Sequence, residues 1–141
     1  MARILIVDDD ADTCDVMRRL FAKWGWESEC LTDSREALPA VRDRRPDVVL
    51  LDVMMPGLDG FAVLAEIRGD PSLTRTPVLF FSALKDQKTL GRALAEGADD
   101  YILKGTPPLQ IRDRVGLYVI DAPIGRRQFP PTTESDSSWA S

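Results

Sequence analysis

Residues 48–51 constrain the fold most strongly, because four consecutive apolar residues are followed directly by the carboxylate of Asp52. Such a run, with two β-branched residues, is typical of a strand buried on both faces in a parallel sheet. Pro56 and Gly57 then turn the chain away. A lone carboxylate is costly to bury within a strand. At the strand's carboxyl end it faces the crevice where open α/β sheets bind ligands, so Asp52 is a candidate functional residue.

The pattern of a short apolar run followed by a helical repeat occurs five times along the chain. The strand-like runs lie at residues 3–7, 26–31, 48–51, 77–82 and 101–104. Apolar residues at helical spacing, which we expect to face the core, follow each run: Val16, Met17, Leu20, Phe21 and Trp24; Ala37, Leu38 and Val41; Gly60, Val63, Leu64 and Ile67; Leu90, Ala93 and Leu94; Ile111, Val115, Tyr118 and Val119. This alternation predicts an α/β fold, a doubly wound (βα)5 flavodoxin-like three-layer sandwich with parallel sheet order 2-1-3-4-5.

The length of the chain, 141 residues, suits a single domain. We expect this domain to span residues 1–120. From residue 121 onward the composition becomes rich in Pro, Arg, Thr and Ser, which is typical of a tail or a linker. We therefore predict a polar Pro/Ser-rich tail or linker stub over residues 121–141.

Composition and charge exclude several classes of function. The net charge of −5 disfavours direct nucleic-acid binding, because phosphate contacts require a basic face. No apolar run approaches the roughly 20 residues of a membrane span, and the N-terminus does not resemble a signal peptide. We therefore expect a cytoplasmic protein without membrane contact.

The reactive residue types are few. Cys14 and Cys30 provide neither a disulfide framework nor a metal site, so we expect two small reduced side chains, buried or half-buried. The chain contains no histidine, the commonest general base and metal ligand. Any chemistry must therefore rest on carboxylates, lysine and hydroxyl groups.

Polar side chains follow the predicted strands that are neighbours in the sheet. Asp8 and Asp9 follow the first strand, Asp52 the third, Ser82 ends the fourth and Lys104 the fifth. Clustered carboxylates repel one another unless a cation lies among them, and Mg²⁺ is the hard cation that suits so few carboxylates. With a lysine and a hydroxyl, the cluster is suited to hold a phosphoryl group, with Asp52 as the nucleophile.

Four motifs resemble the receiver domain of two-component response regulators, of the stand-alone single-domain type. They are Ile-Val-Asp-Asp-Asp at 6–10, Leu-Asp-Val-Met-Met-Pro-Gly-Leu-Asp-Gly at 51–60, Phe-Ser-Ala at 81–83, and Gly-Ala-Asp-Asp-Tyr-Ile-Leu-Lys at 97–104. The resemblance implies a receiver domain over residues 1–120. It also implies a Mg²⁺ site formed by Asp8, Asp9, Asp52 and the backbone carbonyl of Met54.

The resemblance further implies a phosphorylation-controlled switch rather than an enzyme. Asp52 would accept a phosphoryl group from a histidine kinase or a histidine phosphotransfer protein. Ser82 and Lys104 would bind the phosphoryl oxygens, and Tyr101 would change rotamer with Ser82. A downstream protein would then bind the face formed by the fourth helix, fifth strand and fifth helix.

Two positions depart from the family's pattern. Gly105 follows the lysine where the family usually has a proline, often with a cis peptide bond. A cis Lys104–Gly105 bond would cost about 2.5–4 kcal/mol, so we expect a trans bond or a more mobile loop. Pro107 and Pro108 replace the usual acidic cap, so the start of the last helix is expected to shift.

Other interpretations of the same residues remain open. Asp8, Asp9 and Asp10 can cap the first helix, and Tyr101 can serve packing alone. A pseudo-receiver that binds partners without phosphorylation is the alternative function. A phosphohydrolase resembling haloacid-dehalogenase phosphatases is disfavoured, because it usually has a second Asp where Met54 lies. No Gly-rich loop follows the first strand, which disfavours a nucleotide-binding domain.

Overall fold

A computed structural model describes residues 2–119, 127–128 and 131–132, and its centre is a parallel sheet of five strands. The strands are β1 (Arg3–Val7), β2 (Glu27–Leu31), β3 (Val48–Leu51), β4 (Val78–Ser82) and β5 (Asp100–Leu103). Their order is β2-β1-β3-β4-β5, and every pair is parallel, as predicted. The doubly wound topology is therefore confirmed.

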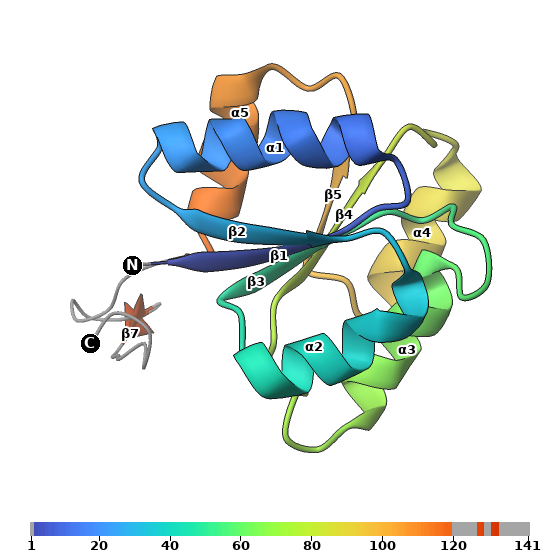
Figure 1. Cartoon of the computed structure of the whole chain (residues 1–141). Coiled ribbons are helices and arrows are strands. Elements are labelled where there is room, and N and C mark those ends of the chain that lie inside the picture. The colour runs from blue at the N-terminus through green and yellow to red at the C-terminus, as the bar shows by residue number, and fades with distance from the viewer. Residues whose placement is uncertain (1, 120–126, 129–130, 133–141) are drawn as a thin grey trace.

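Helices cover both faces of this sheet and complete the three layers (Figure 1). The helices are α1 (Ala11–Lys23), the short 3₁₀ helix η1 (Ser34–Glu36), α2 (Ala37–Arg44), α3 (Gly60–Gly69), α4 (Gln87–Ala95) and α5 (Pro108–Gly116). Helices α1 and α5 lie on one face, and α2, α3 and α4 lie on the other. No helix in the described part of the chain is both long and apolar enough to cross a bilayer.

The sheet is covered on both faces, so the side chains of its strands pack into two separate hydrophobic clusters, one on each face. In β1, Ile4 and Ile6 pack in the cluster that includes the buried residues of α1 and α5. Leu5 and Val7 point to the opposite cluster, with the buried residues of α2 and α3. This alternation within an unbroken apolar run is what a central parallel strand requires.

Aspartate side chains cap the N-termini of three of the α-helices. Asp10 accepts a hydrogen bond from the Asp12 amide in α1, Asp59 from the Ala62 amide in α3, and Asp86 from the Thr89 amide in α4. Helix α5 has no side-chain cap and begins with a proline. A proline is tolerated there because the first amide of a helix needs no intrahelical partner.

Two predicted core positions are wrong. Val16 is 55% exposed and Leu94 is 63% exposed, although their spacing suggested inward faces. In α1 the buried residues are Cys14, Met17 and Phe21, so Val16 lies about one residue off this stripe. In α4 the small residue Ala93 is the buried one, and its neighbour Leu94 is turned toward solvent.

The expectation of two separate thiols is also wrong. Cys14 of α1 and Cys30 of β2 are joined by a disulfide, and their Cα atoms lie 5.9 Å apart. Nothing in the local sequence shows this, because 16 residues separate the two cysteines and only the packing of α1 on the sheet brings them together.

The predicted tail falls largely outside the described residues. Within it the structure describes two short antiparallel strands, β6 (Arg127–Gln128) and β7 (Pro131–Thr132). The boundary at residue 120 therefore stays a prediction.

Candidate functional site

The register of β1 and β3 brings the first carboxylates together. Val7 pairs with Leu51, so Asp8 and Asp52 leave adjacent strands at the same level. The Asp52 amide continues the ladder by donating to the Val7 carbonyl at 2.9 Å. The two side chains therefore emerge side by side at the carboxyl edge of the sheet.

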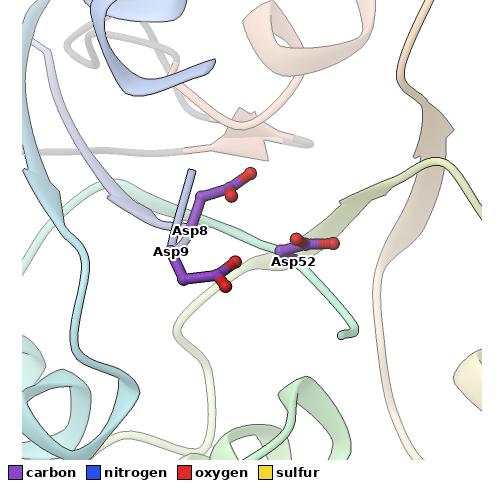
Figure 2. Close-up of side chains that lie close together, drawn as sticks. All are labelled: Asp8, Asp9 and Asp52. Atoms are coloured by element: carbon purple, nitrogen blue, oxygen red, sulfur yellow. The ribbon is translucent and has the colours of Figure 1, made fainter. Parts of the chain in front are cut away.

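Three carboxylates converge at this edge (Figure 2). One oxygen each from Asp8, Asp9 and Asp52 lies within 4.8 Å of the others. Asp8 and Asp52 are buried, whereas Asp9 is exposed to solvent. Hard divalent cations such as Mg²⁺ prefer carboxylate oxygens and retain several waters, so this half-open cluster fits such an ion.

Lys104 follows β5 and places its ammonium between two of these carboxylates. Its Nζ lies 2.8 Å from Asp8 Oδ2 and 3.3 Å from Asp52 Oδ2. Burial alone would lower the pKa of Lys104, but the two neighbouring carboxylates outweigh burial and raise it. Lys104 is therefore a fixed cation at this site.

The charge balance at the site favours a further cation. Burial and the negative charge of Asp8 raise the pKa of Asp52, against the opposing effect of Lys104. Asp8 Oδ2 is buried and accepts no well-aligned hydrogen bond from the described residues, so the ion pair with Lys104 is its polar contact. Three carboxylates facing one ammonium leave an excess of negative charge that a divalent ion would neutralise.

Asp52 has one oxygen fixed by the backbone and one beside the lysine. Its Oδ1 accepts a hydrogen bond from the Val53 amide at 2.8 Å. Its Oδ2 accepts from Lys104 at 3.3 Å. The carboxylate is thus held in a defined orientation at the end of β3.

Ser82 and Tyr101 meet at the backbone of Leu84. The buried hydroxyl of Ser82 accepts a hydrogen bond from the Leu84 amide at 3.2 Å. The Tyr101 hydroxyl donates to the Leu84 carbonyl at 2.7 Å, and its ring packs against Phe80. Burial raises the pKa of Tyr101, which keeps its hydroxyl protonated as this donor. Both residues are therefore anchored to one peptide segment between β4 and α4.

The remaining expected residues lie at the rim of the site. The Met54 side chain is 64% exposed, and its expected backbone contact with a metal stays a prediction. The described residues contain no cis peptide bond, so the Lys104–Gly105 bond is trans, as expected. Gly105 has φ of +100°, a conformation that glycine adopts without strain.

Sequence reasoning missed the role of Gly60 at this site. A Cβ atom at Gly60 would collide with the Asp52 carbonyl and approach the Val53 Cα to 2.9 Å. The Gly60 amide also donates to the Val53 carbonyl at 2.8 Å. A glycine directly after the helix-capping Asp59 was the available signal, because a helix that starts this close to a strand end needs a residue without a side chain.

Comparison with known proteins points to one family. The sequence model of the response regulator receiver domain matches residues 4–116. The DNA-binding response regulator MtrA of Mycolicibacterium paratuberculosis is 38% identical over 113 residues, which cover 80% of this chain and 49% of MtrA. The regulatory protein AtoC of Escherichia coli is 42% identical over 102 residues, 72% of this chain and 22% of AtoC. The chain thus spans about half of the length of MtrA and less than a quarter of the length of AtoC.

Solved structures show the same fold. The BeF3-activated N-terminal receiver domain of Klebsiella pneumoniae RstA superposes with a TM-score of 0.78 at 29% identity, covering 83% of this chain and 97% of that one. The chemotaxis protein CheY4 of Vibrio cholerae gives a TM-score of 0.78 at 27% identity, covering 84% and 98%.

Proposed function

This chain belongs to the family of response regulator receiver domains, and we propose that Asp52 is its phosphoacceptor in a Mg²⁺-dependent phosphorelay. The observation that carries this proposal is the cluster of Asp8, Asp9 and Asp52 with the ammonium of Lys104. A receiver is a signalling phosphoacceptor rather than a classical enzyme. We propose that residues 1–120 form this domain and that residues 121–141 form a tail or linker.

The transfer step uses the Asp52 carboxylate as the nucleophile. An Asp52 oxygen attacks the phosphorus of a phosphohistidine, a new P–O bond forms, and the P–N bond breaks with its electron pair left on the histidine. Burial and the charge of Asp8 raise the pKa of Asp52, whereas the adjacent Lys104 opposes this rise and so favours the carboxylate anion that attacks phosphorus. A Mg²⁺ ion bound by the three carboxylates and the Met54 carbonyl would neutralise charge on the transferring group.

We propose that Ser82 and Lys104 hold the transferred group. Lys104 can exchange its contact with Asp52 for a phosphoryl oxygen while it retains Asp8 at 2.8 Å. The Ser82 hydroxyl accepts from the Leu84 amide and interacts with the Tyr101 hydroxyl, and its proton can turn to a phosphoryl oxygen when one is present. We propose that this exchange carries the signal toward Tyr101.

We propose that the phosphodonor is a histidine kinase or a histidine phosphotransfer protein. The given sequence has no histidine, so the phosphohistidine lies outside residues 1–141. We propose that the output partner binds the face formed by α4, β5 and α5. Leu94 of α4 is exposed, and Arg114 of α5 is paired with Asp100 of β5 at 2.6 Å.

The test is the intact mass of the chain after incubation with Mg²⁺ and acetyl phosphate. We expect one added phosphoryl group in the wild type, and none without Mg²⁺ or in Asp52→Asn. Asp113→Asn is the matched control, because Asp113 lies exposed on α5 away from the cluster. An adduct that persists in Asp52→Asn would reject Asp52 as the acceptor. No adduct in the wild type would favour the pseudo-receiver.

A further inference from the structure

The disulfide between Cys14 and Cys30 joins the first turn of α1, which follows Asp8 and Asp9 in the chain, to the strand β2. Cys14 is in the first turn of α1 and is 4% exposed, whereas Cys30 lies in the edge strand β2 and is half-buried. Their Cα distance of 5.9 Å falls within the range that disulfides span without backbone movement. Reduced and oxidised forms are therefore both compatible with this fold.

Both cysteines adjoin the backbone that carries Asp8. Cys14 Sγ lies 3.5 Å from the Asp8 carbonyl oxygen, and the Cys14 amide donates to the Asp10 carbonyl at 3.1 Å. On the other side, the Asp8 amide donates to the carbonyl of Leu31, the residue after Cys30. The segment of residues 8–10 is thus bonded to α1 at Cys14 and to β2 at Leu31, the neighbour of Cys30.

Oxidation changes how this segment is held. A reduced Cys14 can donate its S–H proton to the Asp8 carbonyl, as a weak hydrogen bond. A disulfide sulfur has no proton, so this hydrogen bond is replaced by a covalent bond from α1 to β2. The covalent form restrains the start of α1 against the sheet, whereas the reduced form leaves it connected only by packing and hydrogen bonds.

We propose that Cys14 and Cys30 are a redox-active pair that low-molecular-weight disulfides oxidise, and that the closed disulfide restrains the acidic segment 8–10. The Cys30 thiolate, being more exposed, attacks the small disulfide, so a mixed disulfide forms and one small thiol leaves. The Cys14 thiolate then attacks Cys30 Sγ, and the second small thiol leaves. Two electrons and two protons pass from the cysteine pair to the small disulfide.

The first test counts free thiols by alkylation, after the full chain has been equilibrated with different ratios of reduced to oxidised glutathione. We expect the number of alkylated cysteines to fall from two to none as oxidised glutathione increases, with no stable glutathione adduct. Cys30→Ser should retain a single reactive or glutathionylated thiol. Two labels under excess oxidised glutathione, or a stable mixed disulfide in the wild type, would overturn the pairing.

The second test measures restraint of the acidic segment by amide hydrogen exchange. We expect exchange in a peptide covering residues 8–15 to slow by about fivefold on oxidation, because local opening becomes less frequent. We also expect the Tm to rise on the order of 10 °C, since the cross-link reduces the entropy of the unfolded chain. Cys30→Ser should show neither change, and equal exchange in both wild-type forms would overturn the restraint.

The consequence for metal binding rests on the proposed function. If the three carboxylates hold Mg²⁺, the oxidised form should bind it about threefold more tightly, because a restrained segment loses less entropy on binding. Equal Mg²⁺ affinity of the two forms would overturn this coupling. Failure of both the reduced and the oxidised form to bind Mg²⁺ would reject the proposed metal site. Thiol alkylation and amide hydrogen exchange would still decide the redox proposal in that case.

Discussion

Asp52 is held in an environment that disfavours its own charge. Burial and the charge of Asp8 raise its pKa, and Lys104 offsets only part of this. The folded chain therefore binds the Asp52 proton more tightly than the unfolded chain does, and the free energy of unfolding falls as pH rises from the ordinary value of 3.8 through the raised pKa. The residue proposed as phosphoacceptor thus destabilises the fold at neutral pH.

We predict that Asp52→Asn stabilises the protein at pH 7 without Mg²⁺ by about 1 kcal/mol, since the substitution removes a repelled buried charge. This gain in the free energy of unfolding should disappear below the ordinary carboxyl pKa, where Asp52 is protonated in both the folded and the unfolded chain. Urea denaturation at several pH values measures the free energy of unfolding. Asp113→Asn, on the exposed surface of α5, should change the free energy of unfolding little. A destabilised Asp52→Asn at pH 7 would contradict the prediction.

At the scale of elements, single contacts determine where helices meet the sheet and one another. Gly60 brings the first turn of α3 against the end of β3. Arg42 of α2 reaches the residue that ends α3, Asp70, at 2.8 Å. Both contacts fix α3, one at each of its ends.

Gly60→Ala should destabilise the fold by about 2 kcal/mol, because the new methyl group collides with the backbone that carries Asp52. It should also slow phosphorylation of Asp52 from acetyl phosphate. Gly91→Ala is the matched control. Gly91 lies in α4 with open space around it, so alanine there should stabilise the helix by about 0.5–1 kcal/mol. Thermal denaturation compares the stability of the two variants with that of the wild type. Equal changes in Tm for Gly60→Ala and Gly91→Ala would contradict the proposed collision at Gly60.

Arg42→Gln should raise the pKa of Asp70 from about 2 toward 3.8. The hydrogen bond from Arg42 is the main cause of the low pKa, followed by those from Ser72. Because the pKa is lowered, the stabilisation is present above 3.8 and is lost as pH falls toward about 2. NMR titration of the Asp70 carboxyl carbon measures the shift. Arg44→Gln, whose arginine pairs with Glu29 instead, should leave the Asp70 pKa unchanged.

At the scale of the whole molecule, the sheet was predictable and several side-chain contacts were not. Unbroken apolar runs such as residues 48–51 specify buried parallel strands, and the order of the sheet follows from right-handed crossovers. That topology alone brings Asp8, Asp52 and Lys104 to one edge, so the composition of the site was predictable as well. The pairing of Lys104 with both Asp8 and Asp52 depends on side-chain positions that the topology does not fix.

Contacts between distant segments depend on how helices rotate and pack. The cross-link between Cys14 and Cys30 and the close approach of Gly60 to Asp52 have no periodic signature in the sequence. The exposed Val16 shows a related limit, because a stripe of apolar residues gives the face of a helix only to within about one residue.

The strand order leaves β2 at one border of the sheet, and among the described residues no strand pairs with its outer side. Its outward residues include Glu27, paired with Arg3, and Glu29, paired with Arg44. Charged side chains along such a border prevent another chain from adding a strand. We predict that Glu27→Thr with Glu29→Val promotes concentration-dependent self-association, measured by analytical ultracentrifugation, whereas Glu66→Thr in α3 does not. The charges of Glu27 and Glu29 therefore act between molecules as well as within one, because they oppose the approach of a second copy of the chain.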